Sequence, residues 1–321
     1  MRLDKNKIKI YSQIGMRATF GMACLELVKE YPNLIVCTAD VSTSAGLDRF
    51  RKNYKDNYVD VGIAEQNLIG IATGLSDNDF EVFTTTFSPF QTLRCCEQIK
   101  VNLGYMKNKV TMIGLASGLI LGELGFTHAS IEDIGAIRSI PNIKIVTPSD
   151  SGELIKCLDN SIREESSIYI RLTGGSNNKV LNHDDYDFEI GKSIELKSGK
   201  DVCIISNGQI LSECMDAADK LMNENISCSV VNMHTIKPID EIRLIDIMSK
   251  FKLIITVEEH NIIGGLGSAV AEIISKNGNN VKQIFLGVND SYAKGGNYIY
   301  MKDYFNISAE KIYQRIKNEI K

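Results

Sequence analysis

The stretch that decides the fold reads Asp60-Val-Gly-Ile-Ala-Glu65-Gln-Asn67 and continues as Leu-Ile-Gly-Ile-Ala-Thr-Gly-Leu75. The run Tyr58–Val61 predicts a strand, Gly62 predicts a turn, and the apolar spacing after it predicts a helix that begins at Glu65. A strand, a tight turn and a helix in this order form the unit from which α/β sheets are built. An acid in the first turn of a helix can simply satisfy the helix dipole, so Glu65 by itself also fits a structural role.

The same alternation extends in both directions along the chain. Helical patterns such as Met16–Glu30, Ile210–Asn223 and Gly267–Lys276 lie between short apolar runs. The runs that predict strands are Leu34–Thr38, Tyr58–Val61, Val82–Thr86, Val110–Leu115, Lys144–Thr147, Ile168–Leu172, Val202–Ser206, Ser227–Asn232, Leu253–Val257 and Gln283–Leu286. Most runs are apolar on both faces, as expected for parallel strands that helices cover on each side. The sequence therefore predicts an α/β protein with two doubly wound domains.

A polar stretch, Thr173–Tyr186, interrupts this alternation with two glycines and three asparagines. Such a composition is typical of a connection between domains. We predict a first domain over residues 1–175, a linker over 176–189 and a second domain over 190–321. Ligands of doubly wound folds bind at the carboxyl ends of the strands, so the residues just after each strand are candidate site residues.

The composition limits the classes of partner and compartment. The 321 residues have a net charge of −4, which excludes the strongly basic surface that a nucleic-acid partner needs. Eight cysteines without CxxC spacing lie mostly in apolar runs, which indicates a reducing compartment rather than disulfides or a metal site. We see no N-terminal leader and no apolar run of membrane-spanning length, and therefore expect a cytoplasmic protein with no membrane partner.

Two further segments place candidate side chains directly after predicted strands. Residues 82–94 read VFTTTFSPFQTLR and contain Phe87 and Phe90, an aromatic pair whose spacing also fits a helix core. Residues 122–133 read GELGFTHASIED and contain His128, one of only four histidines. A histidine here also fits a loop residue beside a helix start, for which Ser130–Asp133 is the signal.

Together these segments resemble the transketolase family. GIAEQN is similar to the family's GIAEQ motif, TFSPF to its TF..F segment, and GELGFTHASIED to its GEDGPTHQ.IED loop, in the same order. The resemblance covers nearly the whole chain, and it implies a pyrimidine-binding domain followed by a transketolase C-terminal domain. It also implies that Glu65 hydrogen-bonds the aminopyrimidine of thiamine diphosphate and activates it, and that Phe87 and Phe90 stack on this ring. His128 would contact the sugar and assist proton transfer.

Three further residues, Arg17, Ser44 and Arg171, fall where transketolases place phosphate-binding groups. An arginine fork suits phosphate because it donates two hydrogen bonds at once. The resemblance implies that these residues bind the substrate, although each also fits an ordinary surface position. The GGLGS sequence of Gly264–Ser268 is similar to a turn of the family's C-terminal domain and lacks the third spaced glycine of a dinucleotide-binding loop.

Two positions depart from the family pattern near the expected substrate. Ala116 stands where many transketolases have a histidine, and Leu124 stands where they have an aspartate that contacts a substrate hydroxyl. The loss of a hydrogen-bonding partner changes substrate discrimination strongly. The sequence therefore predicts an unusual sugar, or one that is bound differently from xylulose 5-phosphate.

The chain also lacks a motif that the resemblance leads us to expect. Thiamine enzymes bind Mg²⁺ and the diphosphate through a GDG…N motif, and no GDG occurs in these 321 residues. A full-length transketolase has a diphosphate-binding domain before the two domains that this chain resembles. We therefore predict a partner chain that carries this domain and the Mg²⁺ ligands, in an α2β2 assembly with thiamine diphosphate at the interface. This chain alone should not hold the cofactor.

The interpretation that we favour is the C-terminal subunit of a split transketolase, which transfers a two-carbon ketol unit from a ketose to an aldose. The β subunit of a 2-oxo acid dehydrogenase decarboxylase also lacks the diphosphate domain, but the THASIEDI loop with His128 argues against it. A deoxyxylulose phosphate synthase is similar in sequence but is normally one chain. A non-catalytic interaction module on the same fold would not need the four candidate residues together.

Overall fold

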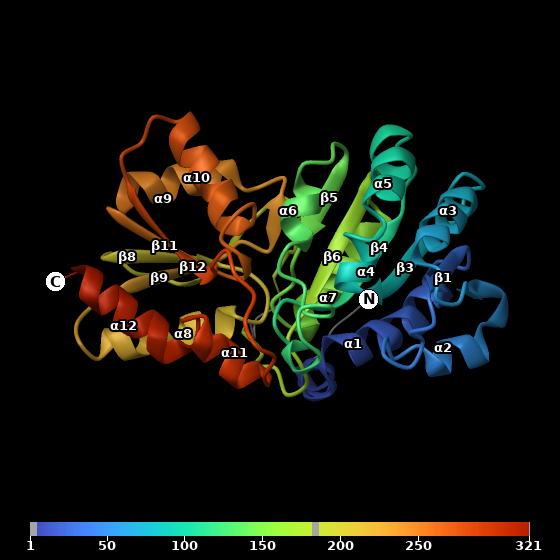
Figure 1. Cartoon of the computed structure of the whole chain (residues 1–321), viewed down its shortest axis with the longest axis horizontal. Helices are drawn as coiled ribbons and strands as arrows, with labels where there is room; N and C mark the ends of the chain where they lie inside the picture. Colours follow the sequence, from blue (N-terminus) through green and yellow to red (C-terminus); the bar gives the residue numbers. More distant parts are fainter. Residues whose placement is uncertain (1–4, 182–185, 321) are drawn as a thin grey trace.

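Two α/β domains lie side by side in the computed structural model, which describes residues 5–181 and 186–320 (Figure 1). Each predicted strand is present, and the α/β class with two such domains is confirmed. The boundaries at 175 and 190 stay a prediction, and residues 182–185 of the predicted linker lie outside the described residues.

The first domain is built on a sheet with the strand order β10-β5-β6-β4-β3-β1-β2. Its own strands are β1 (Leu34–Thr38), β2 (Tyr58–Asp60), β3 (Glu81–Phe87), β4 (Thr111–Ser117), β5 (Ile143–Val146) and β6 (Ser167–Thr173). Its helices are α1 (Lys5–Glu30), α2 (Asp48–Asn53), η1 (Lys55–Asn57), α3 (Glu65–Ser76), α4 (Ser88–Gln91), α5 (Cys96–Gln98), η2 (Ile99–Tyr105), η3 (Gly122–Leu124), α6 (Asp133–Arg138) and α7 (Ser151–Ile162). Helices α1 and α7 pack their apolar residues on one face of the sheet, and α3, η2 and α6 pack on the other.

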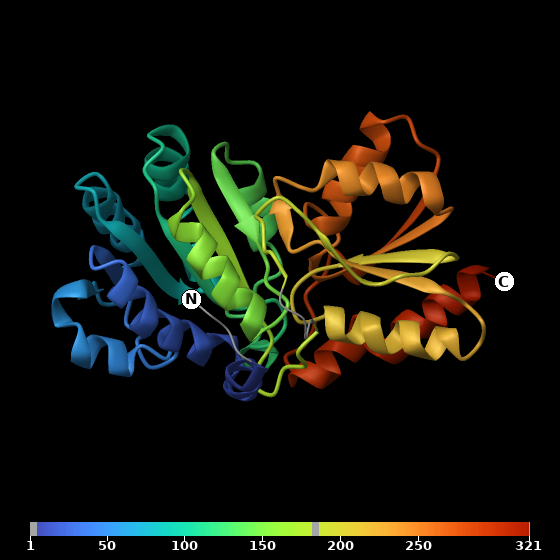
Figure 2. The same ribbon diagram turned by 180° about the vertical axis from the view of Figure 1, so that it is seen from behind.

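The second domain has a sheet with the order β12-β11-β8-β9-β7. Its strands are β7 (Ile194–Lys197), β8 (Val202–Ser206), β9 (Cys228–Asn232), β11 (Leu253–Asn261) and β12 (Lys282–Val288), and its helices are α8 (Leu211–Met222), α9 (Glu241–Lys250), α10 (Leu266–Lys276), α11 (Tyr298–Tyr304) and α12 (Ala309–Ile320). Helices α8, α11 and α12 cover one face, and α9 and α10 cover the other (Figure 2). Within the described ranges, none of the helices combines the length and the apolar character needed to cross a bilayer.

The sequence analysis missed two strands, and both are antiparallel edge strands. The strand β7 pairs with β9 and is only partly buried, so it lacks the continuous apolar run of a covered strand. The strand β10 (Thr235–Lys237) leaves the second domain and pairs with β5 of the first, with Thr235 opposite Val146. The first sheet is therefore mixed, and it receives one edge strand from the other half of the chain.

Segments that follow strands of both sheets meet at the junction between the domains. The amide of Gly208, just after β8, donates to the carbonyl of Thr147, just after β5, at 3.2 Å. The amide of Gln209 donates to the hydroxyl of Thr173, the last residue of β6, at 2.8 Å. The carboxyl end of β8 therefore abuts the carboxyl ends of β5 and β6.

A buried ion pair forms the centre of this junction. Arg171 on β6 is 1% exposed, and its Nε donates to Oδ2 of Asp133, the first residue of α6, at 2.7 Å. The hydroxyls of Tyr169 and Ser88 also donate to this oxygen, at 2.7 and 3.0 Å. The guanidinium Nη2 donates to the backbone carbonyl of Glu259 in the second domain at 2.6 Å. Our prediction that Arg171 binds a substrate phosphate is therefore wrong, because its charge is buried and paired inside the protein.

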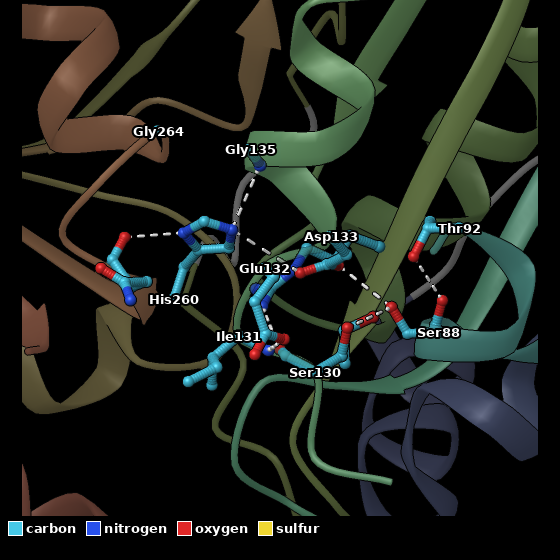
Figure 3. Close-up of polar contacts among 12 residues, drawn as sticks. Ser88, Thr92, Ser130, Ile131, Glu132, Asp133, Gly135, His260 and Gly264 are labelled. Atoms are coloured by element: carbon cyan, nitrogen blue, oxygen red, sulfur yellow. Dashed lines mark hydrogen bonds and ion pairs between the residues drawn. The ribbon is translucent and has the colours of Figure 1, made fainter. Parts of the chain in front are cut away.

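His260 joins the same junction from the second domain (Figure 3). Its Nε2 accepts from the amide of Gly135 in α6 at 3.2 Å and lies 4.0 Å from Oδ1 of Asp133. Burial lowers the pKa of His260 to about 4, although the Asp133 charge opposes this. The neutral ring can therefore accept a hydrogen bond from α6 at neutral pH.

We expect Asp133→Asn to lower the free energy of unfolding by about 3–5 kcal/mol, because Arg171 would stay buried without its counter-charge. Burial alone would raise the pKa of Asp133, but the Arg171 charge and its hydrogen bonds outweigh this and hold that pKa below its usual value. The stability that the ionised Asp133 contributes is fully present above about pH 4, the pKa of an aspartate in the unfolded chain, and is lost as the pH falls through the lower pKa of the folded state. Urea unfolding from pH 7 down to pH 3 should therefore show a difference between variant and wild type that shrinks in acid.

Asp216→Asn is the matched control, because Asp216 pairs with Lys179 on the surface, where ion pairs contribute little. Equal stability of Asp133→Asn and the wild type at pH 7, or a difference that grows in acid, would contradict this account.

Candidate active site

The candidate residues of the first domain gather at one edge of its sheet. Strands β4, β3, β1 and β2 are neighbours in this order, and all are parallel. The segments after their carboxyl ends carry His128 after β4, Phe87 at the end of β3, Ser44 after β1 and Glu65 after β2. This is the edge at which doubly wound sheets bind ligands.

Glu65 begins α3, and the turn before it is held by an aspartate. Oδ1 of Asp60, the last residue of β2, accepts hydrogen bonds from the amides of Asp40 and Gly62, both at 3.0 Å. Asp60 thus ties the ends of β1 and β2 together and fixes where α3 starts. The N-cap residue Ala64 offers no side-chain cap, and Glu65 itself is only 5% exposed.

Arg94 connects Glu65 to the aromatic residues. Its Nη1 donates to Oε1 of Glu65 at 2.7 Å, and its guanidinium lies 4.0 Å from the centre of the Phe90 ring. The backbone carbonyl of Arg94 accepts from the side-chain amide of Gln66 at 3.0 Å, which fixes the chain beside α3. In the described part of the chain no hydrogen bond engages Oε2 of Glu65, so one oxygen of this carboxyl is available to a ligand.

Phe87, Phe90 and His128 form one aromatic cluster. The two phenylalanine rings meet edge to face, with their centres 6.3 Å apart. The His128 ring lies 5.3 Å from Phe90 and 6.0 Å from Phe87, and its Nδ1 is 3.0 Å from the hydroxyl of Thr127. His128 belongs to residues 118–130, here called the His128 loop.

A hollow of about 440 Å³ opens beside Glu65. It is lined by Ile63, Ala64, Glu65, Gln66, Asn67 and Arg94. Ile63 is 78% exposed at its rim, and the Arg94 side chain is 43% exposed. Leu93, the residue before Arg94, is also exposed. The carboxyl of Glu65 is thus a buried group that borders an open, partly apolar space.

Arg17 and Ser44 lie on two segments in close contact. A Cβ atom added to Gly21 in α1 would lie 1.9 Å from the carbonyl oxygen of Gly46, so only glycine allows this approach. Both candidate side chains are half-buried. In the described ranges Arg17 has neither a hydrogen bond nor an ion pair, and burial lowers its pKa. Its half-buried charge therefore lacks a counter-ion among these residues.

The two positions that depart from the family pattern lie in different settings. Ala116, the residue before the end of β4, is fully buried and has a left-handed φ of 52°. Leu124 is 57% exposed in η3, within the His128 loop. Among the residues that the structure describes, no group of three or more His, Cys, Asp or Glu side chains is arranged to hold a metal ion.

The structure adds one residue that the sequence analysis did not single out. Arg94 contacts both Glu65 and Phe90, although these residues are 25 positions apart in the chain. The only signal for it was its place at the end of the VFTTTFSPFQTLR segment. Nothing in the neighbouring sequence distinguishes an arginine at that place from an ordinary surface arginine.

Comparisons with known proteins agree with both domains. Residues 12–178 match the pyrimidine-binding domain of transketolase, and residues 191–312 match the transketolase C-terminal domain. The chain is 37% identical over 309 residues to a putative transketolase C-terminal section of Methanocaldococcus jannaschii, with 96% of each chain covered. It is 37% identical over 289 residues to one subunit of the apulose-4-phosphate transketolase of Actinobacillus succinogenes, with 90% of this chain and 93% of that protein covered.

A solved structure is similar over the same extent. It is described as a split gene transketolase, an inactive β4 tetramer, and it has a TM-score of 0.86 at 32% identity, covering 96% of this chain and 98% of that chain. The similarity therefore extends over both domains and includes the edge of the first sheet where Glu65, Phe87 and His128 gather. This chain belongs to the transketolase family of thiamine diphosphate-dependent transferases, and it corresponds to the C-terminal section made of the pyrimidine-binding and C-terminal domains.

Proposed function

We propose that this chain is the subunit of a two-chain transketolase that binds the pyrimidine end of thiamine diphosphate, and that the pair transfers a two-carbon ketol unit between a ketose and an aldose. The observation that carries the proposal is the continuous contact from Glu65 through Arg94 to Phe90 and on to His128. The reaction needs groups that bind and activate the cofactor and a group that moves protons at the sugar. A buried carboxyl and an aromatic pair suit the first task, and an imidazole at the same sheet edge suits the second.

The residues present fit the pyrimidine end of the cofactor. Oε2 of Glu65 is available at the hollow and can hydrogen-bond a ring nitrogen, and Phe87 and Phe90 offer an apolar surface for the ring. When bound, thiamine diphosphate supplies the carbanion chemistry that breaks and forms the carbon–carbon bond. Glu65 holds or releases the proton at the aminopyrimidine, which a carboxyl in this position can do.

Arg94 limits access to these two groups. Its guanidinium occupies both Oε1 of Glu65 and the face of Phe90. A ring that binds here competes with Arg94 for the carboxyl and for the aromatic face. Arg94 therefore has to loosen its contacts before the Glu65 carboxyl and the Phe90 ring are both open to the cofactor.

His128 and Arg17 are the residues that we assign to the sugar. The His128 ring lies against both phenylalanines and is half-buried, which suits a group that moves a proton at the substrate. Arg17 is a half-buried cation with no counter-ion in the described ranges, which suits a phosphate group, and Ser44 lies on the segment beside it. Arg171 has no part in this proposal.

The partner in our proposal is an N-terminal transketolase subunit that holds the diphosphate and Mg²⁺. The hollow beside Glu65 is open and has the exposed apolar side chain of Ile63 at its rim, and Leu93, which precedes the lining residue Arg94 in the chain, is exposed as well. A partner surface that covers them would enclose the cofactor, and an α2β2 assembly would provide two such sites. The relative in Actinobacillus succinogenes is named as one subunit of its transketolase, which supports an enzyme of more than one chain. All eight cysteines are free thiols, which fits the cytoplasm as its location.

The substrate that we propose is a sugar phosphate other than the common pentose phosphates. Ala116 and Leu124 remove two polar groups from the pattern, and Ala116 is fully buried, so it leaves no space for a histidine ring without rearrangement. The Actinobacillus succinogenes relative is named for apulose 4-phosphate, which supports a substrate of this kind.

Glu65→Gln should lower the activity of the reconstituted pair by about 10²–10⁴-fold, since an amide cannot exchange a proton with the aminopyrimidine. The measurement is ketol transfer at saturating thiamine diphosphate, with circular dichroism as the check on folding. Glu97→Gln, on the exposed surface of α5, is the control and should keep full activity. Wild-type rates in a folded Glu65→Gln pair would remove Glu65 from the mechanism.

The isolated chain should show negligible affinity for thiamine diphosphate in calorimetry, because it holds only the pyrimidine end. Addition of the partner subunit with Mg²⁺ should produce binding, and omission of Mg²⁺ should abolish it. Micromolar binding by this chain alone would refute the two-chain site.

Xylulose 5-phosphate should be a poor substrate of the reconstituted pair, because the polar groups of the family pattern are missing at Ala116 and Leu124. The kcat/KM for xylulose 5-phosphate should be at most about one tenth of that for apulose 4-phosphate, because the loss of one hydrogen-bonding partner can change discrimination by this much. Full efficiency with xylulose 5-phosphate would end the idea of an unusual sugar.

A further inference from the structure

We propose that the second domain positions the His128 loop for the sugar, with Glu259, Tyr298 and Tyr292 as positioning residues. The inference rests on the proposed function of His128 and gives the second domain a task in the reaction. It follows from contacts at the base of the loop, at its far end and next to its last residue, all made by the second domain.

The His128 loop is closed at its base but has little structure of its own. Gly118 and Ser130 bond to each other in both directions, amide to carbonyl, at 2.9 and 3.0 Å. Between them the loop contains only the short η3 and two turns, in the second of which the amide of His128 donates to the carbonyl of Gly125 at 3.1 Å. A segment of this kind has low local stability unless other parts of the protein pack on it.

The base of the loop is held by Glu259 from β11. Its Oε2 accepts from the amide of Leu119 at 3.2 Å, and its Oε1 accepts from the hydroxyl of Tyr298 in α11 at 2.6 Å. Glu259 is 1% exposed, and a Cβ atom added at Gly118 would lie 2.6 Å from Oε2, so the carboxyl fits against the loop backbone only because residue 118 is glycine. Tyr298 therefore fixes the carboxylate that fixes the loop.

The far end of the loop is held by the segment before α11. The amide of Gly296 donates to the carbonyl of Gly122 at 3.1 Å. The Phe126 ring packs on Tyr292, with the ring centres 5.1 Å apart, and meets Phe305 edge to face at 6.3 Å. Phe126 is two residues from His128, so these contacts act close to the imidazole.

The chain just after the loop is held from the same domain. The hydroxyl of Tyr292 donates to Oε1 of Glu132 at 2.8 Å, and the amide of Asn261 donates to the carbonyl of Ile131 at 2.8 Å. Figure 3 shows Ile131 and Glu132 between the loop end at Ser130 and the start of α6. The second domain thus holds the chain on both sides of His128.

The cofactor side of the site has no comparable support. Glu65 and Arg94 contact each other, Gln66 and Phe90, and in the described ranges neither makes a hydrogen bond or ion pair with the second domain. A change in the second domain should therefore alter sugar binding and turnover much more than the affinity for thiamine diphosphate, because among the described residues only the Phe87 and Phe90 rings connect His128 to the cofactor side. This separation follows from the contacts and would not follow from a general role in stability.

The test uses Tyr298→Phe and Tyr292→Phe in the full pair of subunits, because each removes one hydroxyl and keeps the ring. Tyr300→Phe is the matched control, since Tyr300 lies on α11 with an exposed ring and its hydroxyl makes no hydrogen bond in the described ranges. Three quantities are measured: deuterium uptake of the peptides that cover residues 118–131, kcat and KM for the sugar, and calorimetric affinity for thiamine diphosphate with Mg²⁺.

We expect Tyr298→Phe to increase deuterium uptake in the loop and to lower kcat/KM for the sugar by about tenfold, because misplacement of a catalytic group by a fraction of an ångström costs this much or more. The cofactor affinity should stay within twofold of the wild type, and Tyr292→Phe should show a smaller change of the same kind. Unchanged uptake and sugar kinetics in both folded variants would overturn the proposal. So would a parallel loss of cofactor affinity and sugar turnover. If the wild-type pair transfers no ketol unit, the proposed function fails, while the deuterium uptake still decides whether these tyrosines hold the loop.

Discussion

The buried ion pair between Arg171 and Asp133 is the interaction on which the rest of this structure depends. Removal of two charges from water is costly, and the cost is offset here because Tyr169 and Ser88 donate to Oδ2 of Asp133 and backbone carbonyls accept from Arg171. Each partner comes from the first domain, yet Arg171 also donates to the backbone of β11 in the second. A single charged cluster therefore fixes the start of α6, the end of the His128 loop and the junction between the two domains.

This arrangement divides the candidate site into two sides with different surroundings. Glu65 and Arg94 lie beside an open hollow and belong to the first domain alone. His128 lies on a loop that the second domain contacts along its length. The carboxyl ends of β8 and β11, where doubly wound domains bind ligands, are occupied by the first domain. The second domain therefore packs against the first domain with the sheet edge at which it would otherwise bind a ligand of its own.

The fold was predictable to the extent that its strands are covered on both faces. Strands such as β1, β4 and β8 are continuous buried runs, and their sequences show it. The edge strands β7 and β10 are short and antiparallel, and β7 is also partly exposed, so local sequence carries little signal for them. The group of Glu65, Phe87, Phe90 and His128 could be inferred because each lies at or after the carboxyl end of a predicted parallel strand, in a segment that resembles a transketolase motif. Arg94 and Arg171 could not be assigned correctly, because an arginine looks the same in sequence whether it is exposed, stacked on a ring or buried in an ion pair.

The sequence by itself determined the strand–turn–helix unit at Asp60–Leu75, the family and the residues at the carboxyl edge of the first sheet. These features depend on the spacing of residues close together in the chain and on residue types that serve only a few chemical roles. Only the tertiary structure decided that Arg171 is internal, that Arg94 pairs with Glu65, and that the second domain holds the His128 loop. Those contacts join residues from 29 to 179 positions apart, and Coulomb attraction, ring packing and hydrogen bonding across such separations leave no periodic trace in the chain.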